Sequence, residues 1–243
     1  MEEKPGLRID FVTLFPEMVL GVLEHSIPKR AESAGLVSFS AISPRQFTTD
    51  VHRTVDDSPY GGGPGMVIKI EPVAAAMAAL ELEEGTAVVM TDPTGDPFTQ
   101  ARAHELAARS RVVFLCGHYE GFDHRIEELY ATHVFSIGDY VLTGGELPAL
   151  AMADAMIRLL PGALGCAESL EIDSHREGIL SAPQYTRPED FQGHKVPAVL
   201  LSGNHAEIRK WRRREALLLT RDRRPDLWSQ VQLSKEDRKL LGE

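Results

Sequence analysis

Apolar and polar residues follow one another along positions 1–160 in a pattern that predicts strands and helices in alternation. Short apolar runs predict strands at residues 8–14, 37–43, 87–90, 111–117 and 133–139. Apolar residues spaced three or four positions apart predict helices at residues 16–23, 72–82, 99–108, 123–130 and 146–160. The polar segments 45–66 and 92–97 are predicted as a loop and a turn. This alternation indicates an α/β fold, with helices on both faces of a parallel sheet.

The pattern changes after Gly165. Residues 165–203 have no long hydrophobic period and contain several prolines, whereas a helix is predicted from Asn204, which forms a capping box with Glu207. The residues expected on its inward face are Ile208, Trp211, Leu218 and Leu219. Those expected on its outward face are Arg209, Lys210, Arg212, Arg213 and Arg214. We therefore divide the chain into an α/β domain (1–164), a linker (165–180) and a small helical domain (181–243).

Composition and charge narrow the class of protein. The chain has 243 residues, of which 43% are hydrophobic, so it can bury a sizeable core. It contains no apolar run of the about 18 residues that a membrane span needs, and its N-terminus lacks the apolar stretch of a signal peptide. Its two cysteines, Cys116 and Cys166, are too few for a disulfide framework. We therefore expect a cytoplasmic protein with reduced thiols that does not enter a membrane.

The net charge of -10 by itself argues against binding to nucleic acid. The charge is unevenly distributed, however, with a balance of +4 over residues 205–243 and of -14 over the rest. This basic segment is either a solvated helix face or a local contact for phosphate groups.

Residues 137–150, IGDYVLTGGELPAL, predict a small-molecule cleft. A strand leads into a glycine-rich turn and then into a helix N-terminus, where open α/β proteins place ligands. The segment CGHYEG (116–121) follows the most apolar strand and belongs at the same edge of the sheet. Its cysteine and histidines do not have the spacing of a structural zinc site. The loop SPYGGGPGM (58–66) lacks the GK[ST] ending of a nucleoside triphosphate loop, so a flexible surface loop is the alternative there.

Several long motifs resemble the bacterial tRNA (guanine-N1)-methyltransferase (TrmD) family, which belongs to the knotted SPOUT methyltransferases. The motifs occur in the family's order, from Arg8 to about Trp228. They are RIDFVTLFPEM (8–18), HRTVDDSPYGGGPGM (52–66), CGHYEG (116–121), SIGDYVLTGGELPAL (136–150), QYTRP (184–188) and SGNHAEIRKWRRR (202–214). The resemblance implies a deep trefoil knot in the C-terminal part of the sheet domain and a homodimer whose active site lies between the subunits.

The resemblance also implies S-adenosylmethionine as the cofactor, bound in the knot. The residues that match its binding site are Gly117, Tyr119, Glu120, Gly121, Ile137, Gly138, Asp139, Tyr140, Val141, Leu142, Gly144, Gly145 and Pro148. The implied reaction moves a methyl group to N1 of guanine 37 in tRNA and uses Mg²⁺.

Two residues match the catalytic residues of the family. Asp173 matches the general base that removes the N1 proton, and Arg158 matches the residue that stabilises charge on O6. The residues alone favour the simpler interpretation, in which Arg158 is a surface arginine on an amphipathic helix and Asp173 is a turn or cap aspartate. The positions that the resemblance places on the RNA are Asp56, Gly63, Gly65, Arg209, Lys210 and Arg213. The ligands of a metal ion are not predicted.

The chain departs from the family pattern at a few positions. Residues 90–95 are MTDPTG where many members have an aromatic residue followed by SPQG, and Ser181 stands where members often have an acid. Two other functions are consistent with the motifs, a knotted methyltransferase that acts on another RNA and an RNA-binding dimer without turnover. The intact 137–150 segment, Arg158 and Asp173 favour the methyltransferase.

Overall fold

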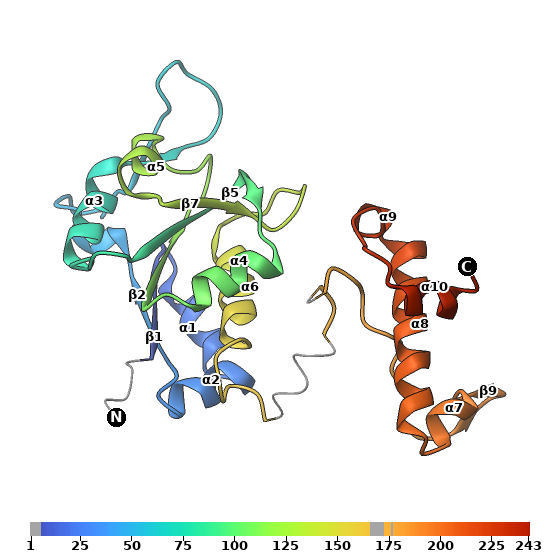
Figure 1. Cartoon of the computed structure of the whole chain (residues 1–243). Helices are drawn as coiled ribbons and strands as arrows, with labels where there is room; N and C mark the ends of the chain where they lie inside the picture. Colours follow the sequence, from blue (N-terminus) through green and yellow to red (C-terminus); the bar gives the residue numbers. More distant parts are fainter. Residues whose placement is uncertain (1–5, 166–172, 176) are drawn as a thin grey trace. The chain divides into compact units, whose positions relative to one another are not determined.

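A computed structural model describes residues 6–165, 173–175 and 177–243 (Figure 1). The chain divides into two compact units, residues 1–165 and 166–243, and each is described by itself. Cys166 and much of the predicted linker lie outside the described residues.

The first unit is built on a parallel sheet, as the sequence predicts. In the described residues the sheet has five strands, in the order β2-β1-β6-β5-β7. Their bounds are β1 (Leu7–Val12), β2 (Val37–Ile42), β5 (Ala87–Pro97), β6 (Arg111–Cys116) and β7 (His133–Ser136). Every neighbouring pair is parallel, so the carboxyl ends of the strands share one edge. That edge is the one where open α/β folds bind ligands.

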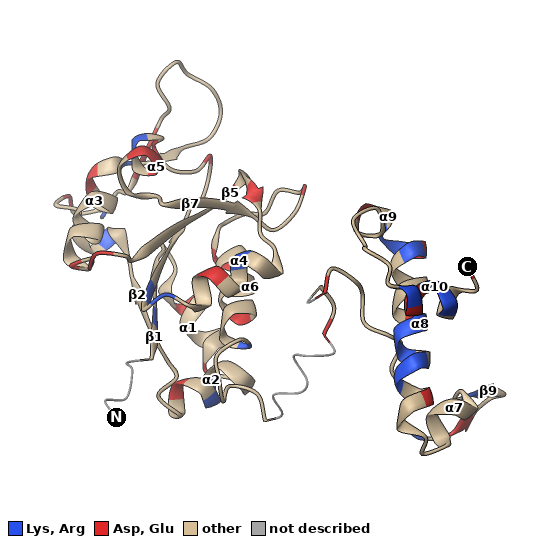
Figure 2. Cartoon of the chain, in the orientation of Figure 1, with Lys and Arg blue, Asp and Glu red and all other residues tan. Residues whose placement is uncertain are grey.

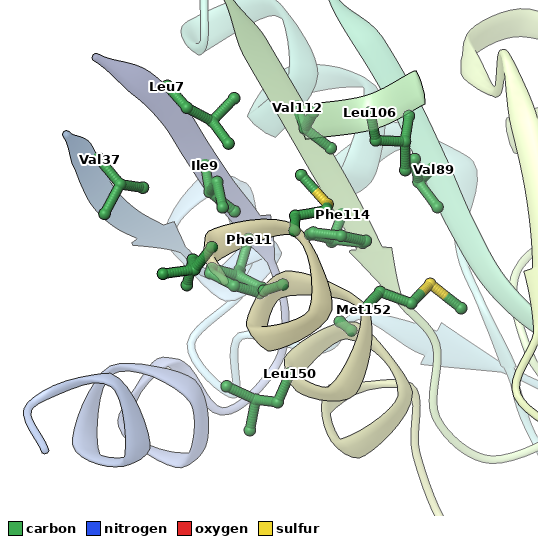
Figure 3. Close-up of a cluster of buried hydrophobic side chains, with 14 of the residues drawn as sticks. Leu7, Ile9, Phe11, Val37, Val89, Leu106, Val112, Phe114, Leu150 and Met152 are labelled. Carbon is green, nitrogen blue, oxygen red and sulfur yellow. The ribbon is translucent and has the colours of Figure 1, made fainter. Parts of the chain in front are cut away.

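Helices cover both faces of this sheet. Alternate side chains of β1 and β6 enter two separate cores, as the two-residue period of a strand requires. On one face lie α1 (Pro16–Leu23), α2 (Ser26–Ser33), α4 (Gln100–Ala107) and α6 (Glu146–Ile157). On the other lie α3 (Ile70–Ala79) and α5 (Arg125–Tyr130). Figure 3 shows Leu150 and Met152 of α6 beside Phe11 and Phe114 of the sheet, whose rings stack 5.5 Å apart.

Four details of the first unit differ from the sequence prediction. β5 continues to Pro97, and residues 92–95 form an irregularity within it because the register with β7 shifts between Thr91 and Asp96. β7 ends at Ser136, so residues 137–139 belong to the following loop. Helix α2 was not predicted, because its sequence SIPKRAES is largely polar. The 45–66 loop also holds a short helical turn (Pro44–Phe47) and strand β3 (Asp56–Asp57), which pairs with β4 (Val67–Ile68).

A buried ion pair joins β1 to the start of β6. The guanidinium of Arg111 donates from Nε to Asp10 Oδ2 over 2.7 Å, and Asp10 is fully buried. Arg111 also donates to the carbonyls of Leu80 and Glu81, which follow α3. Ser40 donates to the other oxygen of Asp10. These contacts satisfy both buried charges at the end of the sheet away from the predicted cleft.

The second unit is mainly helical in its described part. It contains β8 (Asp190–Phe191), β9 (His194–Lys195), α7 (Ala198–Leu201), α8 (His205–Arg223), α9 (Pro225–Trp228) and α10 (Lys235–Leu241). Asn204 begins α8 as predicted, and its side chain accepts from the amides of Ala206 and Glu207. The second half of the predicted capping box does not form: the amide of Asn204 donates to Ser202 Oγ, and the carboxylate of Glu207 accepts from Lys210 at 2.8 Å.

The inward face of α8 is not the one that the helical wheel predicts. Its buried residues are Ala216, Leu217 and Thr220, which pack with α9 and α10, whereas Ile208 and Trp211 are only half-buried. Segments pack on two sides of the helix, so the stripe that looks most apolar in sequence is not the most buried one. The predicted inward face is therefore wrong, because the most buried stripe of the helix runs through Ala216, Leu217 and Thr220.

Candidate active site

A cavity of about 330 Å³ lies at the carboxyl ends of β5, β6 and β7. Its walls come from three segments: the irregular end of β5, the loop after β6, and the loop that joins β7 to α6. This size is within the range of small-molecule sites. The position matches the cleft that the sequence predicts.

Most residues predicted to bind a cofactor line this cavity. They are Gly117, Tyr119, Glu120, Gly121, Ile137, Gly138, Tyr140, Val141, Leu142, Gly144, Gly145 and Pro148. Asp139 is exposed and does not line it. The structure thus brings together two segments that lie some twenty residues apart in sequence.

The β5 end of the cavity was missed in the sequence. Thr91, Asp92, Pro93 and Thr94 line it. Asp92 accepts from the amide and hydroxyl of Thr94 at 2.9 Å and 2.6 Å, which shapes this turn. The signal that could have found these residues is positional: they follow an apolar run predicted as a strand of the same sheet, so they end at the same edge.

Glycines allow the two loops to come close together. The amide of Gly145 donates to the carbonyl of Gly117 over 2.8 Å. The backbones of His118 and Gly144 pair as an isolated antiparallel β-bridge. A Cβ on Gly145 would lie 2.9 Å from Cys116 Cα and overlap the Thr91 hydroxyl. A Cβ on Gly144 would overlap the His118 imidazole. Only glycine permits this approach of backbone to backbone.

Buried polar side chains lie beneath this junction. Glu146, the first residue of α6, is 1% exposed, and its two carboxylate oxygens contact Thr13 and His118. Cys116 lies nearby at the end of β6, and burial together with the charge of Glu146 raises the pKa of its thiol well above the usual value. Cys116 therefore stays a neutral part of the core.

The glycine-rich loop 58–66 is anchored beside the cavity at its base. Glu120 donates its amide to the carbonyl of Met66, and Ile68 donates to the carbonyl of Gly121. Gly65, which has a φ of +85°, lies against the Glu120 side chain. Of the other predicted RNA contacts here, Asp56 is half-buried in β3 and Gly63 is exposed. The structure thus places the loop next to Glu120, although the two are more than fifty residues apart in sequence.

Arg158 does not line the cavity of its own chain. It follows the last residue of α6, while the cavity lies at the first turn of the same helix. The 12 residues of α6 span roughly 18 Å. Arg158 is therefore about one helix length from the cavity walls.

Asp173 belongs to the second unit and is exposed. The segment that carries it is held by its neighbours: the hydroxyls of Ser174 and Ser181 are 3.0 Å apart, and Ser181 donates its amide to Ser174 Oγ at 2.9 Å. Leu180 donates its amide to Thr220 Oγ1 of α8. Ser181, which departs from the family pattern, thus fastens the turn next to Asp173.

The basic residues of α8 have different environments. Figure 2 shows lysine and arginine along this helix. Arg209 and Arg212 are exposed, and Lys210 is exposed but paired with Glu207. Arg213 does not face outward as predicted: its guanidinium contacts Asp237 and Glu177 within the unit. Arg213 is therefore engaged in structural ion pairs.

Among the residues that the structure describes, no group of three His, Cys, Asp or Glu side chains is arranged to hold a metal ion. Within the same residues, no helix combines the length and the apolar character that crossing a membrane requires.

A parallel α/β sheet with a glycine-walled cavity at its carboxyl edge defines a small-molecule-binding enzyme of the open α/β class. The family model described as tRNA (Guanine-1)-methyltransferase TrmD matches residues 7–230. A tRNA (guanine-N(1)-)-methyltransferase of Staphylococcus carnosus is 51% identical over 97% of this chain and 96% of its own. Proteins of the same name from Staphylococcus epidermidis and Staphylococcus aureus are 50% identical over the same shares. The chain belongs to the TrmD family of tRNA (guanine-1)-methyltransferases.

Proposed function

We propose that this protein transfers the methyl group of S-adenosylmethionine to N1 of guanine 37 in tRNA. The observation that carries the proposal is the glycine-walled cavity at the sheet edge, in a chain that matches the TrmD family over residues 7–230. Its first unit ends at Gly165, close to the predicted boundary of a cofactor-binding domain at residue 164.

The cavity fits S-adenosylmethionine in size and in chemistry. Backbone amides and carbonyls of residues 117–121 and 137–145 can recognise the edge of an adenine, and the glycines let a flat ring approach them. Ile137, Val141, Leu142 and Pro148 supply apolar contacts for the ring and the methionine chain. When bound, the cofactor supplies an electrophilic methyl group on its sulfonium.

Asp173 is proposed as the general base. Neutral guanine carries a proton on N1, so its lone pair becomes available only when a base removes this proton. A carboxylate that accepts the proton contributes typically ~10²–10⁴ in rate. Loss of the proton places negative charge on O6, and the guanidinium of Arg158 is proposed to stabilise it by donating hydrogen bonds.

A homodimer with the active site between its subunits accounts for the location of these two residues. Arg158 is about a helix length from the cavity of its own chain, and Asp173 belongs to the other unit. A second copy of the chain could bring such residues to the cavity. We also propose that the chain between β5 and α6 forms the trefoil knot of SPOUT proteins. The close pairing of the loop after β6 with residues 144–145, through the Gly145–Gly117 hydrogen bond and the His118–Gly144 bridge, supports this proposal.

Substrate RNA is proposed to contact both units. Arg209 and Lys210 would contact phosphates, while Asp56, Gly63 and Gly65 would approach the target base. Guanine 37 lies next to the anticodon, where unpaired bases cost less to unstack. The helical residues 181–243 would form the tRNA-binding domain, joined by the linker 165–180. Because the proposed substrate is tRNA, the enzyme is proposed to act in the cytoplasm.

Mg²⁺ is also proposed to take part, but its ligands are left open. Among the described residues, no group of three His, Cys, Asp or Glu side chains is arranged to hold it.

The experiment that tests the proposal measures methyl transfer from labelled S-adenosylmethionine to two tRNA transcripts. The transcripts differ only at position 37, guanine in one and adenine in the other, and each is assayed with Mg²⁺ and with EDTA. We expect transfer only to the guanine transcript, and more of it with Mg²⁺. Equal transfer to both transcripts would contradict N1 of guanine 37 as the target. Transfer to ribosomal RNA but not to tRNA would favour a knotted methyltransferase acting on another RNA.

A further inference from the structure

We propose that Glu146 is a positioning residue that holds the cofactor loop 137–145 against the ends of three strands. The inference rests on the proposed function, because it assigns the cavity to S-adenosylmethionine. Glu146 is not among the residues that line the cavity, and nothing in the reaction itself requires it.

The contacts of Glu146 join segments that are distant in sequence. Its Oε1 lies 2.5 Å from Thr13 Oγ1, which follows β1, and its Oε2 lies 2.7 Å from His118 Nε2, which follows β6. A third strand contacts the same turn, because the hydroxyl of Thr91 in β5 lies 3.2 Å from the carbonyl oxygen of Gly145. The turn 144–146 is thus tied to the carboxyl ends of β1, β5 and β6.

The direction of each hydrogen bond follows from the donors available. The amide of Phe15 donates to Thr13 Oγ1 at 2.9 Å, so the single hydroxyl proton of Thr13 is left to point at Glu146. An ionised carboxylate only accepts, so His118 donates from Nε2. The carboxylate also lies in the first turn of α6, where helix amides favour a negative charge. All these interactions stabilise one position of the Glu146 side chain.

The outer part of the loop has little packing of its own. Tyr140 and Val141 are 56% and 84% exposed, and Leu142 is also exposed. The position of their backbone, which lines the cavity, therefore depends on the anchored end at residues 144–146. A buried, hydrogen-bonded carboxylate adds little to the stability of the folded protein compared with an apolar side chain of the same volume. Its particular contribution here is to fix the geometry of the turn.

The test compares Glu146→Ala and Glu146→Gln with the wild-type protein. The affinity for S-adenosylmethionine is measured by calorimetry, the KM and kcat by methyl transfer, and folding by circular dichroism and thermal melting. We expect Glu146→Ala to weaken cofactor binding and to lower kcat/KM by about tenfold to 100-fold, because a displaced binding loop misplaces the reacting group. Glutamine keeps an acceptor for Thr13, and its amide can donate to His118 Nε2 once the imidazole carries its proton on Nδ1. Glu146→Gln should therefore bind the cofactor more tightly than Glu146→Ala.

The matched control is Asp10→Asn. Asp10 is also a buried carboxylate and lies within β1, but it bonds Arg111 and Ser40 away from the cavity. This control should melt at a lower temperature and still bind the cofactor with wild-type affinity. A loss of affinity in Glu146→Ala but not in Asp10→Asn separates positioning from general loss of stability.

Thr13→Val provides a second test in case Glu146→Ala does not fold. It removes one of the two hydrogen bonds to Glu146 and should weaken cofactor binding less than Glu146→Ala. Wild-type affinity in a folded Glu146→Ala or Thr13→Val protein would overturn the inference and leave the proposed function intact. A wild-type protein that binds no S-adenosylmethionine would overturn both.

Discussion

The guanidinium of Arg213 donates to both carboxylate oxygens of Asp237, from Nε over 2.8 Å and from Nη2 over 3.1 Å. Its Nη1 donates to Glu177 at 2.8 Å. Asp237 also accepts from the amide and hydroxyl of Ser234 in the capping box that begins α10. One arginine of α8 thus connects α10 to the segment that follows Asp173.

Arg213→Ala is expected to destabilise the second unit by about 1–3 kcal/mol, because it leaves the buried carboxylate of Asp237 without its charged donor. Chemical denaturation of the full chain, followed by the fluorescence of Trp211 and Trp228, measures the effect. Arg212→Ala is the control, since Arg212 is exposed and should change stability little. Equal stability of the two variants would contradict a structural role for Arg213.

The stability of the second unit is expected to decrease at low pH. The hydrogen bonds from Arg213, with those from Ser234, lower the pKa of Asp237 to about 2 from its ordinary value of 3.8. A group whose pKa is lower in the folded state stabilises that state above its unfolded pKa. This contribution should therefore be complete above about pH 4 and be lost as the pH falls towards 2. Melting curves from pH 6 to 2 should show a smaller acid-induced decrease in Arg213→Ala than in the wild type.

Asp173→Asn is expected to bind S-adenosylmethionine normally but to methylate about 10²–10⁴ times more slowly, because an amide does not accept the N1 proton of guanine. Single-turnover methyl transfer and cofactor calorimetry measure the two properties. Asp190→Asn, a change at another exposed carboxylate of the same unit, should keep full activity. Wild-type turnover in Asp173→Asn would remove Asp173 from the mechanism.

Arg209→Glu is expected to weaken tRNA binding and to reduce the salt dependence of binding by about one unit in slope, as for one lost phosphate contact. Filter binding at several salt concentrations measures both effects. Arg213→Met should leave the slope unchanged, because Arg213 is already occupied by Asp237 and Glu177. The opposite result, with the slope changed only in Arg213→Met, would restore Arg213 as an RNA contact.

Gly145→Ala is expected to abolish cofactor binding, because the new Cβ would lie 2.9 Å from Cys116 Cα and from Gly117 N. Those neighbours are backbone atoms that cannot move aside easily. Gly21→Ala in α1 is the control, because the new Cβ would have no atom within 4 Å. This variant should be as stable as the wild type or more stable by about 0.5–1 kcal/mol. Calorimetry with S-adenosylmethionine and thermal melting compare the two, and normal binding by Gly145→Ala would contradict the close packing of the loops.

The apolar pattern was sufficient to predict the parallel sheet, most of its helices and the edge where the cavity lies. Strands such as residues 111–116 are buried on both faces, so their sequence is apolar throughout and is easy to recognise. Helix α2 and the continuation of β5 were missed, because polar residues occupy both. Their conformation depends on neighbouring segments rather than on local preference.

The sequence by itself was sufficient to locate the glycine-rich segments of the cleft and, through the resemblance of its motifs, to indicate the family. Only the tertiary structure decided which residues meet. It placed Glu146 against Thr13 and His118, residues 133 and 28 positions away, and it turned Arg213 inward to Asp237. Periodicity describes one helix in isolation, whereas a side chain's partners depend on every segment packed around it. That is why the wheel of α8 gave the wrong face, while the alternating strands and helices gave the right sheet.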